Sequence, residues 1–220
     1  MTQRPRGLRT GVEIAEVLAE AGAFKINLEV PFTHTSGLRA PAYLNCRNLP
    51  DAVRRDLLKD LMLLSNLRDR RTVVVGVQNG GAIWSKALAE QLGRDHASVR
   101  KEVKLDEGWI EGVDVSDRDA FLIEDVCNSG GSTGKAIRHL EAVGARVIGC
   151  CALFAYSKVD MYRFFNERFG IPFRCLAELF DFGGPMARRG LPEEEWDKVL
   201  AGASNPQAWH DTWVAAHPGS

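Results

Sequence analysis

The sequence contains neither a surplus of one charge nor a long apolar run. Its 28 lysines and arginines face 29 aspartates and glutamates, a formal net charge of −1, so the basic excess of a dedicated nucleic-acid-binding protein is missing. No run of about 18 apolar residues occurs, and the N-terminal residues lack the apolar core of a secretory signal. These absences predict a cytoplasmic protein whose partners are neither a membrane nor a nucleic acid.

Cysteine and histidine lack the spacing of a disulfide framework or a metal site. The cysteines are Cys46, Cys127, Cys150, Cys151 and Cys175, an odd number without a C-x-x-C pair. None of the five histidines stands at ligand spacing from cysteine or acid. We expect reduced thiols and no structural zinc, with Cys127 a buried, unreactive cysteine.

The composition is that of a folded globular protein. A chain of 220 residues can bury a core without disulfides, and 45% hydrophobic and 26% charged residues are ordinary values for such a chain. No internal repeat and no domain linker are visible. We therefore predict a single domain over residues 1–220.

Three runs of apolar and β-branched residues determine the predicted fold. They begin at Thr72, Ala120 and Arg146, and each leads through a glycine-rich or polar loop into a helical pattern. Continuous apolar strands that alternate with helices are typical of a parallel sheet covered on both faces. The sequence therefore predicts an α/β fold with its ligand site at the carboxyl ends of the strands.

The flanking segments have other patterns. Apolar residues at helical spacing predict helices over 12–21 and 51–67. Residues 24–47 mix β-forming residues with proline and glycine, which predicts short strands that form a small N-terminal hood. A C-terminal tail from about residue 191 carries three tryptophans. We expect it to pack on the body of the protein, without an assigned place.

The most informative segment is FLIEDVCNSGGSTG, from Phe121 to Gly134. Glycines and serines before a helix let several backbone N–H groups point at one centre, which suits a phosphate. Glu124 and Asp125 precede this loop and would repel the phosphate, but carboxylates accept hydrogen bonds from neighbouring hydroxyls such as those of a ribose. A phosphate and a diol together indicate a ribose 5-phosphate.

Two other interpretations of this loop are weaker. A nucleotide-triphosphate P-loop needs glycine where Ser129 stands and serine or threonine where Ala136 stands. A plain strand-to-helix turn leaves the two carboxylates without a purpose. A second glycine-rich turn, VGVQNGG with Gly80, lets the backbone approach a pyrophosphate closely, although on its own it is equally an ordinary turn.

Cations follow in the segment VRKEVK, which offers Arg100, Lys101 and Lys104. Displacement of pyrophosphate from C1 of a ribose builds negative charge on the leaving oxygens, so cations and the exclusion of water favour the reaction. The alternative is an ordinary solvated charge run, since Glu102 nearly balances the segment.

These segments resemble a known family. The acidic pair and its loop resemble the phosphoribosyl pyrophosphate (PRPP) signature of type I phosphoribosyltransferases, and EDVCNSGGS is similar to the form found in orotate phosphoribosyltransferases. FTHTSGLRAPAYLNCR, residues 32–47, resembles the hood segment of that family, which lies against the base, and VRKEVK resembles the start of its mobile catalytic loop. The resemblance covers roughly residues 12–171.

The resemblance implies a type I phosphoribosyltransferase-like parallel sheet flanked by helices, with the small N-terminal hood. It implies Mg²⁺ bound through the pyrophosphate of PRPP, with no protein ligand to the metal, and a homodimer. The implied catalytic residues are Lys101, Lys104, Asp106 and Asp125. The implied substrate-binding residues are Arg100, Glu124, Asp125, Asn128, Ser129, Gly130, Gly131, Ser132, Gly80, Arg39, Tyr43 and Tyr156.

Four positions depart from the pattern of the orotate enzymes. Asp106 stands where those enzymes usually have a histidine that helps the leaving group. Tyr156 replaces an arginine that pairs with the orotate carboxylate, Asn128 replaces a threonine that faces the base, and Thr35 replaces a commonly basic residue of the hood. PRPP binding is therefore better supported than orotate as the acceptor.

An orotate carboxylate without that arginine loses a charge-assisted pair worth about 1.5 to 3 kcal/mol. Arg39 in the hood is our candidate replacement, with Lys158 and Arg163 as alternatives. We expect transfer of the 5-phosphoribosyl group from PRPP to orotate, which gives orotidine 5′-phosphate and pyrophosphate. The alternatives are the same transfer to another base, or a regulator that senses PRPP and has lost catalysis.

Overall fold

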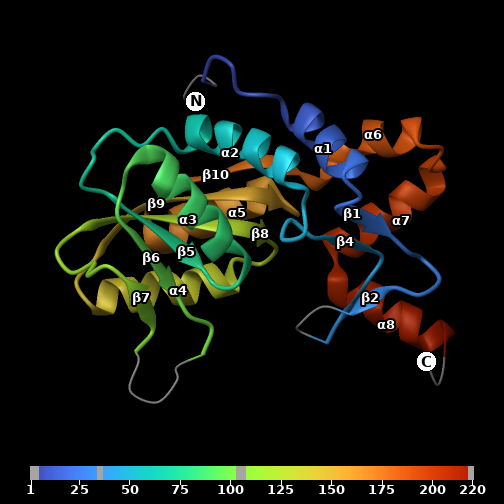
Figure 1. Cartoon of the computed structure of the whole chain (residues 1–220). Coiled ribbons are helices and arrows are strands. Elements are labelled where there is room, and N and C mark those ends of the chain that lie inside the picture. The colour runs from blue at the N-terminus through green and yellow to red at the C-terminus, as the bar shows by residue number, and fades with distance from the viewer. Residues whose placement is uncertain (1–4, 34–36, 103–107, 218–220) are drawn as a thin grey trace.

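A six-stranded sheet forms the centre of the protein in the computed structural model, which describes residues 5–33, 37–102 and 108–217 (Figure 1). In spatial order its strands are β10 (Phe173–Glu178), β9 (Arg146–Ala155), β8 (Asp119–Cys127), β5 (Val73–Val77), β6 (His96–Val99) and β7 (Ile110–Gly112). Neighbouring strands are parallel except for the antiparallel pair β6 and β7. The predicted α/β fold is confirmed, and β6 and β10 are parallel strands that the hydrophobic pattern does not reveal.

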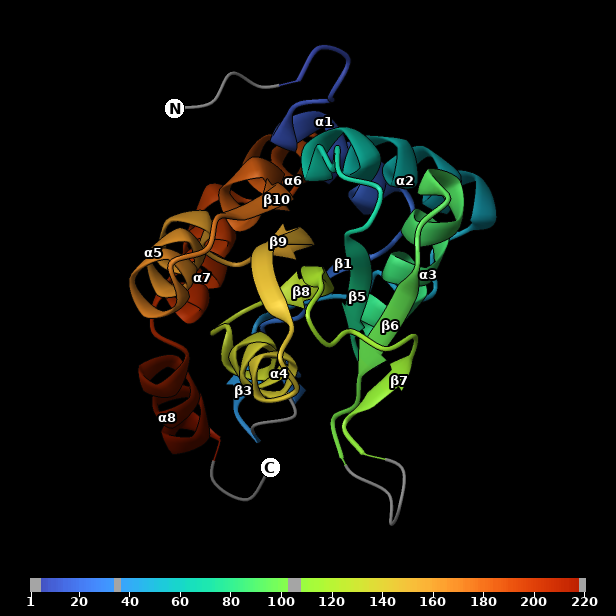
Figure 2. The same ribbon diagram turned by 90° about the vertical axis from the view of Figure 1, so that its left-hand side faces the viewer.

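Helices cover both faces of this sheet (Figure 2). One face carries α1 (Gly11–Glu20), α2 (Asp51–Ser65) and α3 (Gly80–Leu92), and the other carries α4 (Gly131–Ala142) and α5 (Lys158–Phe169). Every residue of β5 is buried as a result, which explains its continuous apolar sequence. Within the described ranges, no helix is long and apolar enough to cross a membrane.

The hood consists of two short antiparallel pairs. β1 (Phe24–Ile26) pairs with β4 (Ala42–Leu44), and β2 (Phe32–Thr33) pairs with β3 (Arg39–Ala40). These strands agree with the short strands predicted over residues 24–47.

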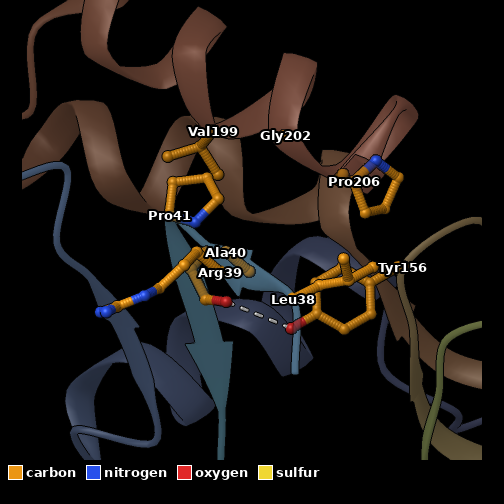
Figure 3. A pocket seen from close by; sticks show the side chains of 10 residues that line it. Leu38, Arg39, Ala40, Pro41, Tyr156, Val199, Gly202 and Pro206 are labelled. Atoms are coloured by element: carbon orange, nitrogen blue, oxygen red, sulfur yellow. Dashed lines mark hydrogen bonds between the residues drawn. The ribbon is translucent and has the colours of Figure 1, made fainter. Parts of the chain in front are cut away.

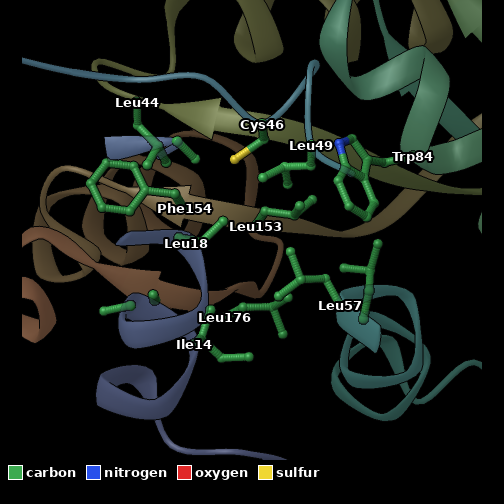
Figure 4. Close-up of a cluster of buried hydrophobic side chains, with 14 of the residues drawn as sticks. Ile14, Leu18, Leu44, Cys46, Leu49, Leu57, Trp84, Leu153, Phe154 and Leu176 are labelled. Carbon is green, nitrogen blue, oxygen red and sulfur yellow. The ribbon is translucent and has the colours of Figure 1, made fainter. Parts of the chain in front are cut away.

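A buried apolar cluster joins the hood to the sheet (Figure 4). Leu44 and Cys46, at the end of the hood, belong to the same cluster as Leu153 and Phe154 of β9. Because this interior is closely packed, the hood stands in a fixed place beside the carboxyl ends of the strands.

The C-terminal tail packs against the hood. After β10 the chain forms η1 (Leu179–Phe182), α6 (Gly183–Arg188), α7 (Glu193–Ser204) and α8 (Pro206–Ala216). Helix α8 contacts β3, and the ring of Trp196 in α7 lies 6.3 Å from that of Phe24, edge to face. The tail therefore supports the outer side of the hood.

Candidate functional site

A cavity of about 480 Å³ opens at the carboxyl edge of the parallel strands, between the sheet and the hood. This is the edge at which an α/β fold predicts its ligand site. Among the residues proposed from the sequence, those that line the cavity are Tyr43, Lys101, Glu124, Asp125, Asn128, Ser129, Gly130, Gly131, Ser132 and Tyr156. Segments far apart in the sequence thus meet at one site.

The acidic pair lies in the last part of β8 and is buried, with Glu124 5% and Asp125 6% exposed. One oxygen of Glu124 accepts a hydrogen bond from the backbone N–H of Asp125 at 3.1 Å, and the other accepts from the Thr133 hydroxyl at 3.3 Å. Burial, together with the charge of Asp125, raises the pKa of Glu124 well above its usual value. Hydroxyl donors from a ligand would stabilise the ionised form of this carboxyl.

Arg47 is a site residue that the sequence analysis did not single out. It follows β4, and its Nε donates to Asp125 Oδ2 at 3.3 Å. Its side chain is 43% exposed and lines the cavity. Its position in the sequence could have indicated a role at the site, because Arg47 is the last residue of the hood segment that carries the family resemblance.

The phosphate-binding loop predicted after β8 forms the entrance to α4. Gly130 has a φ of +71°, and a Cβ there would lie 2.7 Å from the ring of Phe164, so this position requires glycine. Helix α4 begins at the next residue, Gly131, and the described residues give its N-terminus no side-chain cap. Its first backbone N–H groups are thus available to an anion.

The second glycine-rich turn lies directly against the acidic pair. A Cβ on Gly80 would stand 1.8 Å from Asp125 Oδ2, and one on Gly81 would stand 2.4 Å from the carbonyl oxygen of Ile123. Gln78 and Asn79 of this turn line the cavity, and the peptide bond between them is cis. Gly80 itself does not line the cavity, but its missing side chain permits the close contact of the two loops.

Of the cations predicted from the sequence, one lines the cavity and one does not. Lys101 lines the cavity, whereas the guanidinium of Arg100 bonds to the carboxylate of Glu111 on β7 and is not part of the cavity wall. Lys104 and Asp106 lie outside the described residues.

Cys127 is buried, and burial raises its pKa well above the usual value, so the thiol is protonated at neutral pH.

Aromatic side chains occupy the hood end of the cavity. The rings of Phe32 and Tyr43 are 5.6 Å apart. The Tyr156 hydroxyl donates to the carbonyl oxygen of Ala42 in the hood at 3.4 Å (Figure 3), and burial raises the pKa of this phenol. Tyr156 therefore remains a neutral donor and links β9 to the hood.

Arg39 does not reach this cavity. It lines a smaller pocket of about 30 Å³ between the hood and α7 (Figure 3), and its guanidinium carbon lies 4.9 Å from the centre of the Trp213 ring. Lys158 and Arg163 do not line the cavity either. Among the described lining residues the cations are Arg47 and Lys101, so the structure gives no support to Arg39 as the partner of a carboxylate bound in the cavity.

Comparison with known proteins gives the family. The sequence model of one protein family, the phosphoribosyl transferase domain, matches residues 42–161. The orotate phosphoribosyltransferase of Cutibacterium acnes is 34% identical over 206 residues, which are 90% of this chain and 94% of that protein. The orotate phosphoribosyltransferase of Oceanobacillus iheyensis is 31% identical over 150 residues, 66% of this chain and 74% of that protein.

Solved structures share the fold. Leishmania donovani UMP synthase matches with a TM-score of 0.75 and 19% identity over 89% of this chain and 42% of that one. Orotate phosphoribosyltransferase from Aeropyrum pernix matches with a TM-score of 0.65 and 24% identity over 80% of this chain and 98% of that one. The chain belongs to the phosphoribosyltransferase family, as the sequence motifs predict. Orotate phosphoribosyltransferases are among the relatives that match it over most of its length.

Proposed function

We propose that this protein transfers the 5-phosphoribosyl group of PRPP to orotate, giving orotidine 5′-phosphate and pyrophosphate. The observation that supports it most is the buried carboxylate pair of β8 beside an uncapped helix N-terminus, in a chain related to orotate phosphoribosyltransferases. The relatives named above are enzymes, which favours catalysis over the alternative of a PRPP-sensing regulator.

In this proposal each part of the substrate lies against a different part of the site. Glu124 and Asp125 accept hydrogen bonds from the ribose hydroxyls, and the loop from Asn128 to Ser132 holds the 5′-phosphate with backbone N–H groups at the start of α4. The turn of Gln78 and Asn79, which lines the cavity, faces the pyrophosphate. The ring of the base then lies towards Tyr43, Asn128 and Tyr156, at the hood end.

The chemical step joins a ring nitrogen of the base to C1 of the ribose while the bond from C1 to the pyrophosphate oxygen breaks. Pyrophosphate keeps the bonding electrons, and the proton of the ring nitrogen passes to pyrophosphate or to water. Positive charge grows on the sugar and negative charge on the leaving group. Lys101, on the wall of the cavity, can stabilise that leaving group electrostatically. Lys104 and Asp106 belong to this proposal only through the family resemblance.

Magnesium fits the residues present. The described residues contain no cluster of three or more histidines, cysteines or acids that could hold a metal by themselves. The carboxylates of Glu124 and Asp125, which line the cavity, are oxygen donors of the kind that Mg²⁺ prefers. When bound on PRPP, the ion would neutralise pyrophosphate charge that these carboxylates would otherwise repel.

A homodimer and a cytoplasmic location are further parts of the proposal. The first is based on the family resemblance, and the second on the cysteine pattern and the lack of long apolar runs. Gel filtration with light scattering tests the first, and fractionation of cells tests the second.

The experiment for the activity follows both products. The purified protein is mixed with PRPP, Mg²⁺ and orotate, and the formation of orotidine 5′-phosphate and the release of pyrophosphate are measured together. Equal amounts of the two products support the proposal. PRPP binding without either product would favour a regulator.

Another base is the second candidate acceptor. The observation that favours it is Tyr156, a neutral phenol at the base end, where the orotate enzymes usually have an arginine. A neutral base can donate a hydrogen bond to the Tyr156 oxygen and can both donate to and accept from the Asn128 amide, without any cation. The same assay with neutral bases in place of orotate separates the two candidates.

A further inference from the structure

Glu111 receives hydrogen bonds from three segments at the edge of the cavity. It lies on β7, and one of its carboxylate oxygens accepts from Gln78 Nε2 at 2.5 Å and from the Ser98 hydroxyl at 3.4 Å. Its other oxygen accepts from the guanidinium of Arg100. A single carboxylate thus connects the turn after β5, the strand β6 and the residue that follows β6.

The backbone supports the same arrangement. The N–H of Gln78 donates to the carbonyl oxygen of Val99 at 2.9 Å, and Ser98 stands directly opposite Glu111 in the antiparallel pair of β6 and β7. Gln78 Nε2 also lies 3.3 Å from the Ser98 hydroxyl. The side chain of Gln78 therefore takes part in this network. Gln78 and Asn79 also line the cavity.

This network differs from an ordinary surface ion pair. An exposed pair contributes little because water solvates and screens both charges. Here the side chain of Glu111 is 44% exposed, but that of Arg100 is only 12% exposed. The hydrogen bond from Arg100 also lowers the pKa of Glu111 below its usual value, so the carboxylate is ionised at neutral pH. Removal of its charge would leave a mostly covered guanidinium without this partner.

We propose that Glu111 is a positioning residue for the pyrophosphate end of the site. It holds the turn of Gln78 and Asn79 in place beside the segment that carries Lys101, so that this turn and the Lys101 ammonium group face the same leaving group. The inference rests on the proposed function, because it assumes that pyrophosphate leaves from this part of the cavity.

Glu111→Gln is the direct test. The variant has nearly the same size, but its amide N–H₂ replaces an oxygen that accepts from Gln78 or from Arg100, so one donor faces another. The matched control is Glu90→Gln on α3, which removes a charge from an exposed pair with Lys86. Isothermal titration measures the dissociation constants of inorganic pyrophosphate and of ribose 5-phosphate for each protein in the presence of Mg²⁺.

The expected result is selective. Glu111→Gln weakens pyrophosphate binding by about tenfold and leaves ribose 5-phosphate binding within about twofold, because that ligand uses the other end of the cavity. Glu90→Gln changes neither. Unchanged pyrophosphate affinity in Glu111→Gln, or an equal loss for both ligands, would overturn the inference.

Neither ligand contains a base, so the test does not depend on orotate as the acceptor. A wild-type protein that binds neither ligand would contradict the proposed function as well.

A double-mutant cycle tests whether Glu111 acts through Gln78. If it does, Glu111→Gln should weaken pyrophosphate binding much less in a Gln78→Ala background than in the wild type. Equal and independent losses in the two backgrounds would show that Glu111 does not position this turn.

Discussion

The guanidinium of Arg39 lies over the indole ring of Trp213, with 4.9 Å between the guanidinium carbon and the ring centre. The backbone N–H of Arg39 also donates to His210 Nδ1 at 3.0 Å. Both partners belong to α8, so the tail holds the strand of the hood that carries Arg39. This relationship changes what a substitution of Arg39 should do.

We expect Arg39→Gln to affect stability more than the acceptor. Loss of the cation–π contact should cost about 0.5 to 1 kcal/mol, which is a fall of roughly 1 to 4 °C in Tm for a chain of this size. The KM for orotate should rise less than about threefold, because the guanidinium lies outside the cavity. Thermal unfolding and steady-state kinetics measure both, and a tenfold rise in KM with unchanged Tm would restore Arg39 as the partner of the orotate carboxylate.

The contact between α7 and the hood gives a second prediction. A Cβ on Gly202 would lie 2.5 Å from Cγ of Pro41 (Figure 3), so Gly202→Ala must push the helix away from the hood. We expect a loss of about 1 to 3 kcal/mol in the free energy of unfolding and a higher KM for the base with little change in that for PRPP.

Gly184→Ala in α6 is the control for Gly202→Ala. A Cβ there would come no nearer than 3.4 Å to any neighbour, the end of the Arg188 side chain. Equal stability and equal kinetics for the two variants, measured by denaturant unfolding and initial rates, would show that the tail does not support the hood.

The acidic pair should govern the affinity for PRPP. Combined Glu124→Gln and Asp125→Asn substitutions keep the side-chain volumes but weaken the acceptors of the ribose hydroxyls, at about 1.5 to 3 kcal/mol for each charged hydrogen bond. We expect PRPP binding, measured by calorimetry, to weaken by at least about a hundredfold. Asp119→Asn, at the other end of β8 in a pair with Arg146, should leave the affinity unchanged. If the double variant binds PRPP like the wild type, the ribose does not lie on this pair.

Glu124 also predicts a pH dependence of stability. Its pKa in the folded protein is raised well above the usual value by burial and by Asp125, whereas in the unfolded chain it titrates near about 4.3. Between these values the folded state binds one more proton, so the free energy of unfolding falls as pH rises, by up to about 1.4 kcal/mol per pH unit.

Glu124→Gln removes this titrating group, and its free energy of unfolding should lack that fall. Denaturant titrations from roughly pH 4 to pH 7 compare the variant with the wild type. The variant should gain stability relative to the wild type as pH rises. Parallel curves for the two proteins would contradict the raised pKa.

The sequence predicts the sheet and the loops better than it predicts the contacts between distant segments. β5, β8 and β9 are buried on both faces, so their apolar runs are visible directly. β6 is only four residues long and begins at a half-buried histidine, and β10 contains Arg174 and Glu178. Neither strand has a pattern strong enough to recognise.

The site residues likewise fall into two groups, those close together in the sequence and those that meet only in the folded protein. Glu124, Asp125 and the loop after them are neighbours in sequence, so their common role can be predicted. Arg39 meets its partner Trp213 only through the folding of the tail onto the hood, and Arg47 reaches Asp125 across 78 positions. Local pattern carries no information about such contacts, which is why the position of Arg39 was not foreseen and Arg47 was missed.

The choice of acceptor is the most direct test of the proposed activity. Initial rates of pyrophosphate release are measured with saturating PRPP and Mg²⁺ for orotate and, at equal concentrations, for uracil, adenine, guanine and hypoxanthine. We expect kcat/KM for orotate to exceed that for every other base by at least about tenfold, a difference of roughly 1.4 kcal/mol in transition-state binding. A neutral base that exceeds orotate by the same factor would contradict orotate as the acceptor.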